Sequence, residues 1–129
     1  MFAVDRDKRG RRAWMRLWSG EIRMRERVWI SGTGRPAPVA EVGVSEPGGV
    51  MVRPVARAGQ IVALRGPEAR IGDTLGLPPR RRVHRFPPAT VQSLVEPVDP
   101  SQRGALFAGL TELADEDPLI DLRIDDVEG

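Results

Sequence analysis

Short segments in which apolar and polar residues alternate, separated by glycines, most constrain the fold of this chain. Residues 13–18 read AWMRLW, so Ala, Met and Leu would share one face and Trp, Arg and Trp the other. A period of two is typical of a β-strand that is buried on one side. Residues 28–30, VWI, continue this alternation, whereas residues 59–66, GQIVALRG, form a short apolar run bounded by glycines, which suits a buried strand. We therefore predict a mainly β fold, a small antiparallel β-barrel, because closure removes exposed strand edges.

Charge divides the chain into two parts. Residues 1–85 carry 18 Lys or Arg against 8 Asp or Glu, whereas residues 86–129 carry 2 against 10, which together give the net charge of +2. This asymmetry indicates two units with different surfaces, the first suited to phosphates. Lys8 is the only lysine. Arginine offers a planar fork for phosphate, but codon bias would give the same excess, so the clustering of the cations carries more weight than their type.

A segment rich in proline and arginine, LPPRRRVHRFPP, lies between these two parts. Its four prolines favour an extended, stiff conformation, and its arginines keep it in water. We therefore assign a barrel to residues 1–78, a linker to residues 79–88 and a second unit to residues 89–129. His84, the only histidine, is expected to be a solvated linker residue. One histidine cannot build a multi-histidine zinc site, and no serine–histidine–aspartate triad is apparent.

The second unit has the pattern of a truncated β-α-β segment. We expect strands at VQSLVEPVD (residues 91–99) and LIDLRID (residues 119–125), and a helix between them that ends at Pro118. The helix start has the order of a capping box: Asp99, Pro100 and Gln102. Its apolar face would consist of Leu106, Phe107, Leu110, Leu113 and Ala114. Three elements leave this face poorly covered, so self-association is expected.

Several classes of protein are excluded or disfavoured by residues that the sequence lacks. There is no cysteine, hence no disulfide or thiolate metal site. No apolar run is long enough for a membrane span, and no secretory signal is evident, so we expect a cytoplasmic protein without a membrane partner. The phosphate-binding pattern G-x-x-x-x-G-K-[ST] is missing, and Gly32-x-Gly34 is a turn rather than a dinucleotide site. We predict no enzymatic activity for this chain.

Three consecutive carboxylates, Asp115, Glu116 and Asp117, would lie at the end of the predicted helix. Together with Asp121 or Asp125 they could form a metal site. Carboxylate clusters are common on solvated surfaces, however, so we expect them to cap the turn before Pro118 and predict no metal site.

The basic segment at the start of the chain is the candidate RNA-binding surface. Four cations close to Gly10, Lys8 to Arg12, would lie on a hairpin tip, and three spaced by two, Arg23 to Arg27, would project from one face of the next strand. Charge on rigid strands suits RNA, which is recognised largely by shape and by contacts to phosphate and ribose. The alternative is a half-buried strand whose arginines stack on tryptophan rings. The candidate rRNA-binding residues are Lys8, Arg9, Arg11, Arg12, Arg23, Arg25 and Arg27.

Two tryptophans in the same segment are predicted to point outward. If Met15 and Leu17 face the core, Trp14 and Trp18 face away from it. An outward aromatic pair often marks a protein interface. We therefore predict that these tryptophans pack against a neighbouring domain, while the arginines contact RNA.

Four stretches together resemble one family. They are, in order, FAVDRDKRGRRAWMRLWSGEIRMRERVWI, AGQIVALRG, IGDTLG and VEPVDPSQRGALFAGLTELADEDPLIDLRID. They are similar to translational GTPases related to elongation factor G, and most similar to the ribosomal protection proteins that confer tetracycline resistance. The resemblance covers nearly the whole chain. Gln60 departs from it, because the family usually has an acidic residue at that position.

This resemblance implies a fragment made of the second domain, a translation-factor-type β-barrel, and the start of the third, one half of a ferredoxin-like α+β fold. It implies a non-catalytic segment that contacts the ribosome at small-subunit rRNA. GTP and Mg²⁺ would bind a domain outside this chain, so we expect no cofactor here. A fragment of a translocation factor of the elongation factor G type and a stand-alone protein-interaction barrel are the alternatives.

Overall fold

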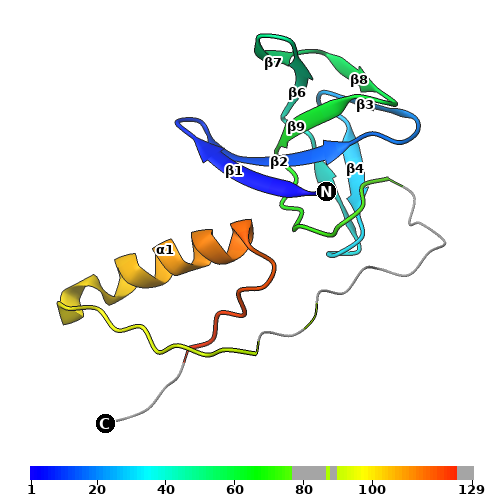
Figure 1. Ribbon diagram of the computed structural model, residues 1–129. Helices are drawn as coiled ribbons and strands as arrows, with labels where there is room; N and C mark the ends of the chain where they lie inside the picture. Colours follow the sequence, from blue (N-terminus) through cyan, green and yellow to red (C-terminus); the bar gives the residue numbers. More distant parts are fainter. Residues whose placement is uncertain (77–86, 88–89, 125–129) are drawn as a thin grey trace. The chain divides into compact units, whose positions relative to one another are not determined.

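The computed structural model describes residues 1–76, 87 and 90–124, which fall into two units, residues 1–84 and 85–129 (Figure 1). Nine strands lie in the first unit, and a short 3-10 helix and one α-helix lie in the second. Most of the predicted linker, including His84, lies outside the described residues. No helix among the described residues is long and apolar enough to cross a membrane.

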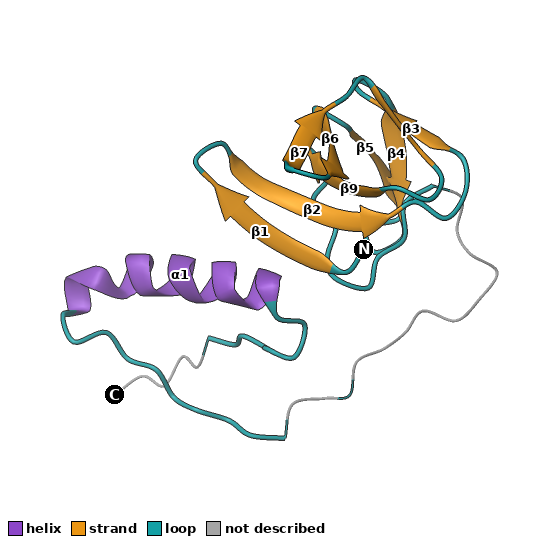
Figure 2. Ribbon diagram, turned by 45° about the horizontal axis from the view of Figure 1, so that its top comes forward, coloured by secondary structure: helices purple, strands orange, loops and turns teal. Residues whose placement is uncertain are grey.

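The first unit contains three antiparallel sheets (Figure 2). The largest has the order β1 (Ala3–Asp7), β2 (Gly10–Arg16), β9 (Ile61–Arg65), β6 (Glu41–Glu46) and β7 (Gly49–Val52). The two smaller sheets pair β3 (Glu21–Arg23) with β8 (Val55–Arg57), and β4 (Arg27–Ile30) with β5 (Arg35–Pro38). The prediction of a mainly β, antiparallel first unit is confirmed.

One core lies on the inner face of the five-stranded sheet. Alternate residues of β2 and β9 pack into it, because successive side chains of a strand point to opposite faces. Residues from β3 and β8 join the same core, so two sheets share it. Its buried members are Ala13, Met15, Leu17, Ile22, Val39, Val42, Val44, Ala56, Val62 and Leu64. The strand pairs of the described residues form three separate sheets, and closure into a barrel stays a prediction.

The expectation of one strand carrying Arg23, Arg25 and Arg27 is wrong. β3 ends at Arg23 and β4 begins at Arg27, and the two strands belong to different sheets. Between them Arg25 adopts a left-handed conformation with φ 67°. Its N–H donates to the carbonyl of Val39 at 2.8 Å, so the turn is fixed by a residue distant in sequence. The chain turns here because it passes from one small sheet to the other.

The helical part of the second unit begins, as predicted, with a cap at Asp99. The Asp99 side chain accepts a hydrogen bond from the Ser101 N–H at 2.9 Å and precedes the 3-10 helix η1 (Pro100–Gln102). Helix α1 (Arg103–Glu116) follows, but the Gln102 side chain makes no capping hydrogen bond. At the other end, Asp117 accepts from the Leu119 N–H at 2.9 Å across Pro118. The carboxylate therefore caps the turn, as expected.

The two strands predicted to flank this helix do not form in the described residues. Residues 90–98 and 118–124 have no strand, and Asp125 lies outside the described residues. Alternation alone does not make a strand, because each strand needs a second one to satisfy its backbone N–H and C=O groups. The expected self-association through the apolar face of α1 stays a prediction.

Candidate nucleic-acid interface

The β1–β2 hairpin presents a basic turn, as the sequence predicts. The two strands pair in register from Ala3 opposite Trp14 to Asp7 opposite Gly10. Lys8 and Arg9 form the turn between them, and Gly10 adopts φ 106°, which favours glycine. The Lys8 side chain is exposed and forms no described ion pair. The hairpin tip therefore holds one exposed ammonium group, that of Lys8, that a ligand can reach.

The other three candidate cations of the hairpin are engaged by the protein itself. Arg9 pairs with Glu41. Arg12 forms a bidentate pair with Asp5, at 2.8 Å from Nε and 2.6 Å from Nη2. Arg11 donates to two backbone carbonyls of the segment after β9, those of Pro67 and Ala69. Arg9 and Arg11 consequently join the hairpin to β6 and to the segment after β9, Arg12 joins its two strands, and only part of their hydrogen-bonding capacity is left for a ligand.

Arg65 is the centre of this ion network, and the sequence analysis did not single it out. Its guanidinium contacts Asp7 at 2.5 Å, Glu41 at 3.1 Å and the carbonyl of Gly10 at 3.0 Å. Its side chain is only 12% exposed. The network joins β1, β2, β9 and β6. A signal was present in the sequence, because Arg65 ends an otherwise apolar strand, where an unpaired charge would be unfavourable.

The network holds two of its carboxylates in the ionised form. Hydrogen bonds from the Arg12 guanidinium lower the pKa of Asp5, and a hydrogen bond from Trp14 adds to this effect. For Asp7, the hydrogen bond from Arg65 and then the Arg9 backbone N–H lower the pKa. A carboxylate whose pKa is lower in the folded state stabilises that state above its unfolded pKa.

We expect stability to fall as the pH drops below about 3.8, the ordinary pKa of both aspartates, toward their lower folded values. A variant with Asp5→Asn and Asp7→Asn should be less stable than the wild type at neutral pH. Its stability should also decline less steeply with acid, because its two network amides do not titrate. Urea unfolding at a series of pH values measures both curves. Parallel curves for the two proteins would contradict this role of the aspartates.

The remaining candidate cations form a separate group near the β3–β4 turn. Arg23 pairs with Glu21. Arg27 donates to the carbonyl of Pro36 at 3.0 Å. Arg25 is exposed at the turn and forms no described side-chain hydrogen bond or ion pair. Figures 1 and 2 show the hairpin tip and β3 at opposite ends of β2, so the seven candidates do not form one cluster.

Both tryptophans point away from the core, as predicted, but they differ in exposure. Trp14 is half-buried, lies opposite Ala63 on β9 and has the Arg12 guanidinium 5.4 Å from its ring centroid. Trp18 is 80% exposed, and Arg16 stacks on it at 4.6 Å. The stacking of arginine on tryptophan, the alternative reading of this segment, is thus present. Packing of Trp14 and Trp18 against a further domain stays a prediction.

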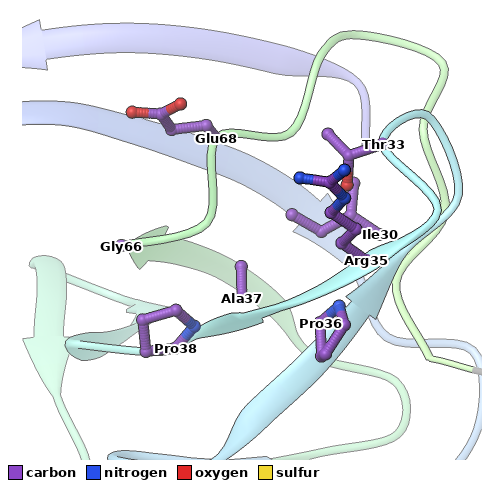
Figure 3. A pocket seen from close by; sticks show the side chains of 8 residues that line it. All are labelled: Ile30, Thr33, Arg35, Pro36, Ala37, Pro38, Gly66 and Glu68. Atoms are coloured by element: carbon purple, nitrogen blue, oxygen red, sulfur yellow. The ribbon is translucent and has the colours of Figure 1, made fainter.

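An open hollow lies beside the β4–β5 hairpin (Figure 3). Thr33 and Arg35 lie on one side of it, Glu68 lies on the other, and prolines of β5 form its floor. This lining has one cation and one carboxylate and lacks a nucleophile with a neighbouring base. Within the described ranges, no group of three or more His, Cys, Asp or Glu residues is placed to hold a metal ion.

Comparison with known proteins finds relatives named as tetracycline resistance proteins and as elongation factor 2. Tetracycline resistance protein TetW of Butyrivibrio fibrisolvens is 32% identical over 91% of this chain, and TetM from transposon Tn5251 of Streptococcus pneumoniae is 35% identical over 92%. Elongation factor 2 of Pyrobaculum calidifontis is 34% identical over 88%. The chain spans 19%, 19% and 16% of these relatives. No family model matches it.

Proposed function

Because the chain is homologous to part of the translational GTPases, we propose that it is a non-catalytic ribosome-binding segment whose first unit contacts small-subunit rRNA. The single observation that supports this proposal best is the basic hairpin turn, which the Arg65 network fixes to the sheet. Because the network holds the backbone of this turn, less conformational entropy is lost when its exposed cations meet a phosphate. GTP and Mg²⁺ would bind outside the aligned segment.

The candidate cations would contribute unequally. Lys8 and Arg25 have no described ion pair and are the primary phosphate contacts. Arg9 and Arg23 are exposed and pair with carboxylates, and such surface pairs contribute only about 0–1 kcal/mol, so a phosphate replaces them at little cost. Arg11, Arg12 and Arg27 would mainly add to the local positive potential.

For the whole protein we propose ribosomal protection against tetracycline as the first candidate, since TetW and TetM match across nine tenths of the chain. Elongation factor 2 matches at the same level of identity, which favours a factor acting in translocation as the second candidate. We expect the residues that separate the two to lie in the parts of these relatives outside the aligned segment.

We expect the chain to co-sediment with purified small ribosomal subunits, more weakly as salt rises. In the double variant Lys8→Ala, Arg25→Asn, the slope of log affinity against log salt should become shallower by about 1.5, because two phosphate contacts are lost. Asparagine suits position 25 because it tolerates a positive φ. Sedimentation across a salt series measures the slope.

Arg53→Ala is the control, because it removes a positively charged side chain that already pairs with Glu46 at 2.9 Å and is not a candidate phosphate contact. It should pellet like the wild type. If the double variant also pelleted like the wild type, the assignment of Lys8 and Arg25 would be wrong. If the wild type did not pellet at low salt, the protein-interaction barrel would replace the ribosome-binding proposal.

A further inference from the structure

Trp18 is an aromatic ring presented to solvent with a cation behind it. It lies two residues after the last residue of β2, and 80% of its surface is exposed. The Arg16 guanidinium lies 4.6 Å from the ring centroid. A tryptophan at this exposure adds little to the core, and it places a large apolar surface in water. The ring surface not covered by Arg16 is thus available to a flat partner.

The backbone on both sides of Trp18 is held by hydrogen bonds to the β8–β9 connection. The Leu17 N–H donates to the Gln60 carbonyl at 2.9 Å, and the Gly59 N–H donates to the Leu17 carbonyl at 2.7 Å. On the other side, the Ala58 N–H donates to the Gly20 carbonyl at 3.0 Å. The ring therefore projects from a fixed segment, which lowers the entropy lost when a ligand stacks on it.

Two exposed arginines belong to the segments that hold Trp18, Arg16 at the end of β2 and Arg57 just before the β8–β9 connection. The described contacts of Arg16 include no carboxylate. Arg57 is 75% exposed, and its one described carboxylate contact, with Glu21, is at 4.0 Å. Ser19, which follows Trp18 in the chain, is exposed and polar, and the exposed Ile61 lies opposite Arg16 in the β2–β9 register. The centre of a protein interface is usually apolar and depleted of charge, so this pattern favours a ligand with an aromatic ring and a negative charge.

We infer that Trp18 is a stacking platform for one unpaired base of RNA, with Arg16 and Arg57 placed near the phosphate of that nucleotide. The inference rests on the proposed function in taking RNA as the partner. It adds a contact of another kind, because stacking requires a base that is free of a duplex, whereas phosphate contacts do not. The site is sequence-tolerant, since every base has a flat face.

The test uses the full chain and two fluorescein-labelled probes, a twelve-nucleotide single strand of uridine and a twelve-base-pair RNA duplex, at low salt. Fluorescence anisotropy gives the affinities. Trp18→Ala should weaken binding of the single strand about 5- to 100-fold and leave duplex binding unchanged. Trp18→Phe should retain most of the affinity, because phenylalanine also stacks. Ile61→Ala removes a neighbouring exposed apolar side chain and should have no effect on either probe.

Equal affinity of wild type and Trp18→Ala for the single strand would overturn the inference and leave Trp18 to a protein interface. Equal loss of affinity for both probes would overturn it as well, because that pattern indicates a general change of the surface. These outcomes are separate from sedimentation with ribosomal subunits. If the wild type does not sediment with ribosomal subunits but binds the single strand through Trp18, only the ribosome proposal is refuted. If the wild type does sediment and Trp18→Ala binds the single strand as tightly as the wild type, only the stacking site is refuted.

Discussion

Replacing Gly66 by alanine is expected to lower the free energy of unfolding by about 3–5 kcal/mol. Gly66 follows β9 and has φ +106°, a conformation that alanine adopts only with strain. A Cβ at this position would also lie 2.4 Å from the Pro38 carbonyl oxygen and 2.9 Å from the Ala40 N–H nitrogen. Both are backbone atoms, so the clash cannot be relieved by a side-chain rotation. Urea unfolding of the full chain, followed by circular dichroism, measures the loss.

Gly48→Ala separates the two causes. Gly48 has a similar φ of +99°, but a Cβ there would meet no atom within 4 Å. Its substitution should therefore lower the free energy of unfolding by only about 1–2 kcal/mol, the contribution of backbone strain. Equal losses for the two variants would show that the close approach of the β5–β6 connection to Gly66 does not matter.

The strands with the clearest patterns could be predicted from the sequence, because alternation in one and an apolar run bounded by glycines in the other indicate the buried residues. Residues 13–18 and 59–66 show this, and they contain most of β2 and all of β9. The break in residues 21–30 could not be predicted in the same way. The positive φ of Arg25 depends on a hydrogen bond to Val39, fourteen positions away, and no local pattern encodes that partner.

The candidate site was predictable in its location but not in the availability of its cations. Gly10 and the charges around it were enough to place a basic hairpin tip. Arg9 and Arg11 are engaged by Glu41 and by the carbonyls of Pro67 and Ala69, which lie more than thirty residues further along the chain. Clustering in sequence therefore overstates how much positive charge a ligand meets.

The second unit shows the opposite limit. Its helix and both ends of that helix were predicted well, because Asp99 and Asp117 act on backbone groups only two residues away. The flanking segments have the alternation of strands and remain unpaired in the described residues. Helix caps are local, whereas strands are formed by pairs of segments, so the sequence of one segment cannot settle them.

Leu64→Ala is expected to lower the free energy of unfolding by about 2–5 kcal/mol, the range for removing a fully buried leucine. Leu64 is fully buried in the middle of β9, opposite Ala13 on one side and Val42 on the other. Both neighbours are small or β-branched and fixed in the sheet, so the structure has little freedom to fill the cavity. Denaturant unfolding measures the change.

Val52→Ala is the control, since Val52 lies half-exposed on the edge strand β7 of the same sheet. Its truncation should change the free energy of unfolding by no more than about 0.5 kcal/mol. Leu64→Met should lose less than about 1.5 kcal/mol, because it nearly conserves the volume. If Leu64→Ala lost no more than Val52→Ala, the core of the first unit would not lie between β2, β9 and β6. The basic hairpin would then be held in place by the Arg65 network alone and not by packing of the core beneath it.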